Sequence, residues 1–291
     1  MKPILRKVDS GHNYSFSIHE DIYPFLYNHW HYDPEAELAY IRKGTGIRLA
    51  GDSVEQFEDG DLILLGADLP HYWRSDAVYF KENSGMHVEA VAIHFKEDFW
   101  GRDFLELPEM LPIKKLLQQA KRGIKISGKT KKIIIPKMEA MLKAKDSGRI
   151  EGLLNLLQVI AASKERSLLS STGFTKMYDT ADTERINEIY NYTFNNFKKQ
   201  ITVKKIAAAV NISPNSFCRY FKTRTLKTYW QFLIEVRIGN ACKLLIENKM
   251  SVAAICYECG FNNLSNFNRH FKSIIHMNPL QYSKTYLQGK Q

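Results

Sequence analysis

The 291-residue chain has few cysteines, no long apolar run and no excess of acidic charge. Its four cysteines all follow residue 217 and are too few for a disulfide framework, so a reducing compartment is expected. No stretch approaches 18 consecutive apolar residues, so no transmembrane helix is predicted. Residues 1–7 lead into polar residues without an apolar segment, so no secretory signal is expected. We therefore expect a cytoplasmic protein without a membrane partner.

The composition is that of a globular protein, with 44% hydrophobic and 25% charged residues over a length typical of about two domains. The formal net charge of +10 is unevenly spread: residues 1–100 carry −8, residues 101–175 carry +8 and residues 176–291 carry +10. Seven of the nine histidines lie in the first 100 residues. This asymmetry predicts that the C-terminal part, and not the N-terminal part, contacts a polyanion.

Short apolar stretches separated by turn signals recur in the first hundred residues. Residues 37–41, 62–65 and 88–95 have the length and composition of strands, and glycine-containing turns lie at 43–46 and 58–61. No helical pattern separates them, which argues against a doubly wound α/β fold. The spacing is typical of a small all-β sandwich or barrel, which we assign to residues 1–105.

The histidines of this region have a distinctive arrangement. His29-Trp30-His31 is followed by Glu37 and Gly44, and later Gly66 precedes Pro70-His71. The arrangement resembles the two motifs of the cupin fold, in which His-x-His, a Glu and a later His converge inside a β-barrel. The second motif usually carries Pro-x-Gly before its His, and Gly66 and Asp68 stand at those positions here.

The resemblance leaves two interpretations of these side chains. Imidazole and carboxylate ligands suit Zn, Fe, Mn or Ni, which gives a metal site at His29, His31, Glu37 and His71, with Glu35 as a rival to Glu37. We favour a metal-free pocket in which aromatic walls stack on a small molecule such as a sugar, although the aromatics could equally fill the barrel. The ligand-binding candidates are His29, Trp30, His31, Glu37, His71 and Trp73. No cofactor is expected.

Helical periodicity marks the middle of the chain, residues 106–172. One helix is predicted from Ile113 and a second after Pro136, with a basic, turn-like segment at 125–132 that has no assigned role. The apolar stripe over 153–161 is wider than one packing face requires, so we predict a helical connector that also forms a dimer contact. The Ser- and Thr-rich residues before 184 predict a linker at 173–183.

An internal repeat occupies the last hundred residues. Residues 203–222 and 252–272 align with an offset of 49 in their first part and 50 in their second part. The extra residue falls in a turn, where an insertion is tolerated best. Each copy predicts a helix-turn-helix, at about 202–223 and 251–273, and apolar residues of helical period over 229–246 predict a helix between them.

The second helix of each copy has an apolar and a polar face. Two phenylalanines four residues apart predict the buried face, namely Phe217 and Phe221 in one copy and Phe267 and Phe271 in the other. The polar faces follow i, i+3, i+4, i+7 spacing and consist of Asn215, Cys218, Arg219 and Lys222, and of Ser265, Asn268, Arg269 and Lys272. Arg and Asn can pair with guanine and adenine in the major groove, whereas Lys at the helix end reaches phosphate. We predict base contacts from the first three residues of each set and phosphate contacts from Lys222 and Lys272.

Residues 184–286 closely resemble the AraC/XylS family of bacterial transcription regulators. The signature residues are Ile255, Gly260-Phe261, Ser265, Phe267, Arg269, Phe271-Lys272, Pro279 and Tyr282. The resemblance implies a non-enzymatic regulator that binds double-stranded DNA as a homodimer, contacts RNA polymerase and senses a small molecule, such as a carbohydrate, in a cupin-like domain. The family usually has Gly where Leu226 and His276 stand, which concerns turn geometry.

The predicted fold class is α+β with two domains: an N-terminal cupin-like β-barrel, a helical connector and an all-α C-terminal tandem helix-turn-helix domain at 184–286. Cys256-x-x-Cys259 aligns with Ala207 and Val210 of the first copy, so these cysteines are predicted to be core residues and not metal ligands. Two alternatives to a ligand-responsive regulator stay open. One is a metal-dependent cupin enzyme with an appended DNA-binding module, and the other is a constitutive DNA-binding protein whose barrel only supports dimerisation.

Overall fold

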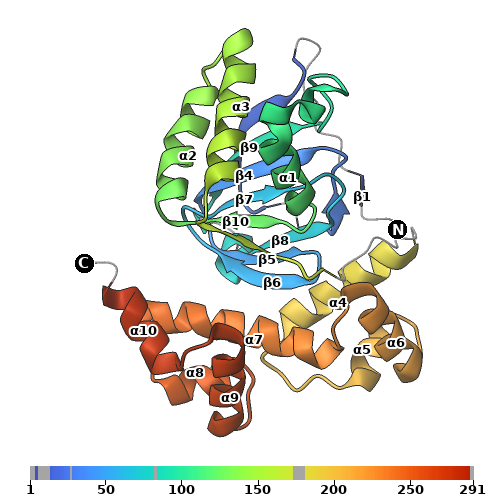
Figure 1. Cartoon of the computed structure of the whole chain (residues 1–291). Helices are drawn as coiled ribbons and strands as arrows, with labels where there is room; N and C mark the ends of the chain where they lie inside the picture. Colours follow the sequence, from blue (N-terminus) through green and yellow to red (C-terminus); the bar gives the residue numbers. More distant parts are fainter. Residues whose placement is uncertain (1–3, 6–13, 27, 82–83, 173–180, 289–291) are drawn as a thin grey trace. The chain divides into compact units, whose positions relative to one another are not determined.

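The structure, a computed structural model, describes residues 4–5, 14–26, 28–81, 84–172 and 181–288 (Figure 1). The chain divides into two compact units, one formed mainly by residues up to 180 and the other mainly by residues from 181 onward. Among the described helices, none is long and apolar enough to cross a membrane. The predicted two-domain α+β organisation is confirmed at this level.

Two β-sheets form the N-terminal unit, and the described strands leave them separate, so they do not close into one barrel. The five-stranded sheet has the order β1 (Ile4–Leu5), β3 (His31–Tyr32), β8 (His71–Ser75), β5 (Gly46–Ala50) and β6 (Ser53–Phe57). The six-stranded sheet has the order β11 (Arg166–Leu168), β10 (Ile124–Ile126), β7 (Leu62–Leu65), β4 (Ala36–Lys43), β9 (Val88–Phe95) and β2 (Ser17–Tyr23). Strand β1 pairs with β3 in parallel. The pairs β3–β8, β5–β8, β10–β11, β7–β10, β4–β7, β4–β9 and β2–β9 are antiparallel.

Side-chain alternation gives the six-stranded sheet two buried faces. Leu38, Leu64 and Ile93 point to one face, where they pack with α1 (Leu111–Ala120), α2 (Gly128–Met141) and α3 (Ser147–Ala162). The residues between them, such as Ala39 and Ile63, point to the other face and pack with Ala50, Phe57 and Trp73 of the five-stranded sheet. Short 3-10 helices at Ala77–Phe80, Phe104–Glu106 and Pro108–Met110 complete this unit.

The middle segment packs on the sheet and adds strands to it, so it shares one compact unit with the strands. Pro136 lies inside α2, which begins at Gly128, so the prediction that the helix follows Pro136 was wrong. A proline inside a helix removes one backbone hydrogen bond, and burial of Ile134 and Met138 on either side of it outweighs that loss. The segment 125–132 forms the end of β10 and the first turn of α2, where it was predicted to be turn-like.

Burial of α3 against its own unit accounts for most of its wide apolar stripe. Leu153, Leu156 and Leu157 are fully buried in the core beneath the helices. Leu154 and Ala161 are partly buried against the same core. The partly exposed residues Leu154 and Ala161 are what the stripe leaves for a second chain to cover.

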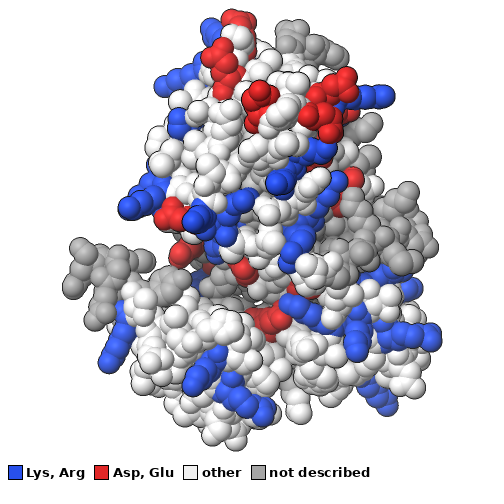
Figure 2. Space-filling model, in the orientation of Figure 1, with Lys and Arg blue, Asp and Glu red and all other residues white. Residues whose placement is uncertain are grey.

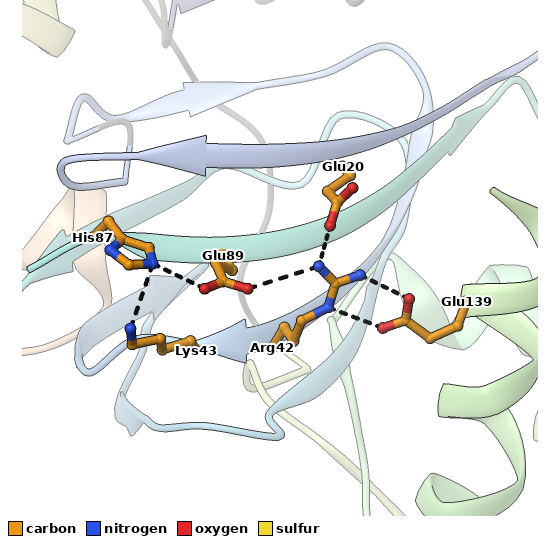
Figure 3. Close-up of polar contacts among 6 residues, drawn as sticks. All are labelled: Glu20, Arg42, Lys43, His87, Glu89 and Glu139. Atoms are coloured by element: carbon orange, nitrogen blue, oxygen red, sulfur yellow. Dashed lines mark hydrogen bonds and ion pairs between the residues drawn. The ribbon is translucent and has the colours of Figure 1, made fainter.

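A charged network holds α2 to the end of the sheet (Figure 3). Arg42 of β4 donates from Nε and Nη2 to the two carboxylate oxygens of Glu139 on α2, at 3.0 and 2.7 Å. Its Nη1 pairs with Glu20 of β2 and lies 3.7 Å from Glu89 of β9. Glu89 in turn bonds to His87 at 2.9 Å. Hydrogen bonds to Glu139 and Glu20 raise the pKa of Arg42, and the guanidinium thus connects three strands and a helix.

From residue 181 onward the described residues form helices and no strands, as predicted. The helices of the C-terminal unit are α4 (Ala181–Asn196), α5 (Val203–Ala209), α6 (Pro214–Thr225), α7 (Tyr229–Glu247), α8 (Val252–Glu258), α9 (Leu264–Ile275) and α10 (Pro279–Gln288). The predicted linker at 173–183 lies outside the described residues up to 180, and α4 begins at Ala181.

Local capping fixes where the repeated helices begin. The side chain of Ser213 accepts a hydrogen bond from the backbone N–H of Ser216 at the start of α6, and Asn263 accepts one from Asn266 at the start of α9. Thr228 and Gln231 form a reciprocal capping box at the start of α7. The repeat in sequence is therefore also a repeat in structure.

Candidate functional site

Each copy of the repeat folds as a short helix, a turn and a longer helix, α5–α6 in the first and α8–α9 in the second (Figure 1). Phe217 and Phe221 of α6 are fully buried, and their rings lie edge-on to Tyr229 at 5.2 and 5.5 Å between centroids. Phe267 and Phe271 occupy the equivalent positions in α9 and are also fully buried. The predicted helix-turn-helix pairs and their apolar faces are confirmed.

One continuous helix, α7, supports both pairs. Its first half places Phe232 against Phe221, with 5.5 Å between ring centroids. Its second half buries Ile238, Ala241 and Leu245 in the core of the second pair. The apolar positions of α7 therefore serve two cores in succession.

Opposite the phenylalanines, α6 and α9 present polar faces to solvent. All eight residues predicted to contact DNA are exposed: Asn215, Cys218, Arg219, Lys222, Ser265, Asn268, Arg269 and Lys272. Arg269 donates from Nη2 to the side-chain oxygen of Asn266 at 3.0 Å, which supports the guanidinium on the exposed face. Figure 2 shows that Lys and Arg predominate over Asp and Glu on the visible surface of α4–α10. A helix with this exposed chemistry can lie in a major groove.

The cysteines of the second pair have a structural role. Cys256 and Cys259 are fully buried free thiols packed with Ile255 and Phe261. Burial raises the pKa of both thiols, that of Cys259 to about 12, so they stay protonated and unreactive at neutral pH. The prediction that they are core residues is confirmed. Cys218 on α6 is the exposed cysteine.

The ligand-binding candidates of the N-terminal unit lie in different surroundings. His29 is exposed, whereas Trp30 and Trp73 are 3% and 5% exposed and fill the interior. His31, Glu37 and His71 come together as the sequence predicted. His71 Nε2 lies 3.4 Å from Glu37 Oε2, and the His31 and His71 rings are 4.1 Å apart between centroids.

Two further residues complete this group, which we call the interior cluster: His31, Asp33, Glu37, His71 and His94. Strand register explains its assembly, because His31 pairs with His71 in the five-stranded sheet and Glu37 pairs with His94 in the six-stranded sheet. Asp33, between β3 and β4, lies with its Oδ2 atom 3.6 Å from His71 Nε2. The cluster therefore joins the facing surfaces of the two sheets.

Burial alone would lower the pKa of the His71 imidazole, but the adjacent carboxylates of Glu37 and Asp33 outweigh burial and raise it. Sequence reasoning missed Asp33 and His94. The alternation of β9 carried a usable signal for His94, since it places His94 on the same face as Val88 and Ala90. Nothing comparable marks Asp33, which lies outside a strand.

A separate surface pocket of about 360 Å³ lies between β10, β11 and the end of α3. Its lining includes Gln119, Ser163, Lys164 and Arg166. None of the ligand-binding candidates from the sequence lines it. The pocket and the interior cluster are therefore different features of the N-terminal unit.

The fold and exposed chemistry of the C-terminal unit define a tandem helix-turn-helix domain. A helix-turn-helix family profile matches residues 206–285. The chain is similar to YdeC of Bacillus subtilis, an uncharacterized HTH-type transcriptional regulator, with 31% identity over 115 residues that cover 38% of this chain and 40% of that protein. It is also similar to the transcriptional activator RhaS of Klebsiella pneumoniae, with 25% identity over half of each chain.

Among solved structures, the DNA-binding domain of AdpA in complex with a target DNA shares 26% identity. The match covers 35% of this chain and 92% of that domain, with a TM-score of 0.34. The chain spans about half the length of the curated relatives it matches. Residues 206–285 are a helix-turn-helix domain of the AraC type, and the resemblance to AraC/XylS regulators predicted from the sequence is confirmed for this part of the chain.

Proposed function

We propose that the chain regulates transcription by binding specific double-stranded DNA sequences through α6 and α9. The observation that carries the proposal is the exposed polar face that recurs, with Arg and Lys in the same phase, on the second helix of both pairs. A solvated polar face is ordinary for one helix. Two copies in phase, each with its apolar face packed in a core and joined by α7, favour a shared ligand with a repeating structure. The net charge of +10 over residues 176–291 agrees with a polyanion.

The proposed contacts divide by chemistry. Arg219 and Arg269 read guanine, Asn215 and Asn268 read adenine, and Cys218 and Ser265 contact base edges beside them. Lys222 and Lys272 contact phosphate, which supplies affinity without reading sequence. With 19 residues rising about 1.5 Å each, α7 is about 28 Å long, close to the ~34 Å between successive major grooves on one side of the duplex.

For the N-terminal unit we propose a cupin-like sensor that binds a small-molecule effector and assembles two chains into a homodimer that contacts RNA polymerase. A ligand switches such a regulator only if it binds two arrangements of the dimer with different affinity. The two-sheet architecture with a polar interior supports a binding role for this unit. The proposal includes no catalytic step.

The experiment that tests the DNA-binding proposal begins with selection of bound sequences from a random duplex pool by the full chain. Arg269→Ala is then expected to weaken binding to the selected site by ~1–3 kcal/mol and to relax one base position. The charge-matched control is Lys145→Ala, because Lys145 is exposed on the N-terminal unit. An equal loss of affinity for the selected and the scrambled duplexes would show that Arg269 does not read a base. Failure to enrich any sequence would contradict the proposal itself.

Lys272→Ala is expected to act differently from Arg269→Ala. It should weaken the selected and scrambled duplexes alike, because phosphate contacts are independent of sequence. The slope of log K against log salt should become shallower by about 1, the release of one counterion. Binding titrations at several salt concentrations measure both quantities. A loss of affinity confined to the selected duplex would instead indicate that Lys272 contacts a base.

A further inference from the structure

We propose that the interior cluster binds one divalent transition-metal ion per chain, held by side chains from both sheets of the N-terminal unit. The cluster contains three imidazoles and two carboxylates, His31, Asp33, Glu37, His71 and His94, all no more than 6% exposed. The proposed site differs from the one expected from the sequence, because it includes Asp33 and His94 and leaves out the exposed His29.

Distances within the cluster match a coordination shell. Two ligand atoms at about 2.1 Å from a tetrahedral ion lie about 3.4 Å apart. The distance from His71 Nε2 is 3.4 Å to Glu37 Oε2 and 3.6 Å to Asp33 Oδ2. Asp33 Oδ2 lies 3.9 Å from His31 Nε2, and Glu37 Oε1 lies 3.7 Å from His94 Nε2. The ligand atoms form two overlapping triads, His31–Asp33–His71 and Asp33–Glu37–His94, and within each triad they lie within 4.8 Å of one another. Asp33 belongs to both triads, so one ion beside Asp33 can draw its ligands from either.

The tautomers of two histidines are set for metal binding. His31 Nδ1 lies 2.7 Å from the carbonyl oxygen of His29, and His71 Nδ1 lies 2.9 Å from that of Leu69. A carbonyl oxygen only accepts, so both Nδ1 atoms carry a proton and both Nε2 atoms face the carboxylates. An ion entering the cluster would displace any proton from Nε2 and bind there. A ligating histidine commonly donates its other N–H to a backbone carbonyl in this way, which fixes the ring orientation.

The charge and donor types favour a transition metal over other occupants. Two buried carboxylates bring two negative charges into the interior, which a divalent cation neutralises. Imidazole donors favour Zn, Fe, Mn or Ni, whereas Mg and Ca prefer an all-oxygen shell. Trp30 and Trp73 are both buried, which leaves their ring faces little open to a sugar. Because the ligands come from both sheets, bound metal would also clamp the two sheets together.

The first measurement uses the full chain stripped with a chelator and titrated separately with Zn²⁺, Mn²⁺, Ni²⁺ and, as a control, Mg²⁺. We expect uptake of one ion per chain for at least one of the first three, with release of protons as the imidazoles bind, and a rise in the unfolding temperature of the N-terminal unit. The alternative is that the imidazoles and carboxylates of the interior cluster only hydrogen-bond to one another. In that case none of the first three ions binds, and the proposal is overturned.

Variants then locate the ion. His71→Ala and His94→Ala should each lower the affinity by more than the roughly 10–100-fold that loss of an outer-shell partner costs. His29→Ala should leave affinity within about twofold, because its backbone carbonyl still orients His31, and the surface variant His87→Ala should do the same. If His29→Ala strongly lowered the metal affinity and His94→Ala did not, the ligands would be those expected from the sequence, and the proposed set would be wrong.

One measurement needs no variant and so does not depend on variants that fold. X-ray absorption of the metal-loaded chain should show a first shell of nitrogen and oxygen with imidazole scattering. A sulfur shell would move the ion to the cysteines and overturn the proposal. Metal binding is independent of the proposed regulatory function, since affinity for the selected DNA is measured separately and either result can fail without the other.

Discussion

Leu226 and His276 end α6 and α9 in the left-handed region, with φ of 56° and 63°. These are the two positions at which the family usually has glycine, so the departure in sequence does not change the backbone conformation. A side chain in this conformation costs about 1–2 kcal/mol relative to the right-handed region, and glycine avoids that cost. Each helix therefore ends at the expected residue with some strain retained.

Leu226→Gly is predicted to stabilise the C-terminal unit by about 0.5–1 kcal/mol, since relief of strain exceeds the extra entropy of glycine in the unfolded chain. Leu226 is 43% exposed, so little packing is lost. Asn248→Gly is the matched control: Asn248 also has a positive φ, of 51°, but Asn tolerates this region and should gain little. Urea denaturation followed by circular dichroism measures both. Destabilisation by Leu226→Gly would show that its side-chain contacts outweigh the strain.

At the scale of elements, Arg42 is expected to matter more than an ordinary surface cation, because it faces three carboxylates from two strands and a helix. Arg42→Gln should lower the free energy of unfolding of the N-terminal unit by about 1–2 kcal/mol, the range for hydrogen bonds to charged groups reduced by partial solvent screening. Lys114→Gln, which breaks the isolated exposed pair with Glu106, should cost much less. Equal losses in the two variants would show that the network adds nothing beyond a single pair.

Glu165 stabilises the first turn of α2 in a pH-dependent way. Its carboxylate accepts hydrogen bonds from the backbone N–H and the hydroxyl of Thr130, and these bonds from the first turn lower the pKa of Glu165. A lowered carboxyl pKa contributes stability that is present above the unfolded pKa of ~4.3 and is lost as the pH falls through the folded pKa. Glu165→Gln should therefore destabilise the N-terminal unit at neutral pH and converge with the native chain in acid. Denaturation curves across the acidic range measure the convergence, and a gap that stays constant with pH would contradict it.

The features that could be predicted from the sequence are those fixed by interactions between residues close together in the chain. The paired phenylalanines and the capping residues of α6 and α9 act within a few residues, and both helix-turn-helix pairs were predicted from the sequence. The interior cluster depends on which strands pair and in what register, so Asp33 and His94 were missed although His31, Glu37 and His71 were found. The start of α2 was predicted wrongly for a related reason. Burial of α2 against distant parts of the chain outweighs the local helix-breaking effect of Pro136.

At the scale of the whole molecule, the uneven charge matches a division of labour between the units. The acidic first hundred residues form a two-sheet domain with a buried polar interior, and the basic last third forms the tandem helix-turn-helix domain. Charge alone would suit any polyanion. The length of α7 is a more specific feature, because one continuous helix links the two faces that we propose contact DNA.

Spacing within the selected DNA site therefore provides a test of the tandem arrangement. Inserting about 5 bp, half a helical turn, between the halves contacted by α6 and α9 should reduce affinity roughly 100-fold or more, toward that of one half alone. Inserting about 10 bp restores the phase of the duplex but not the distance, and a helix about 28 Å long cannot span the added turn, so affinity should stay low. Arg219→Ala, which disables one face, should be much less sensitive to either insertion. Recovery at 10 bp would show that the two halves are read by separate chains or through a flexible connection, and not by one chain through α7.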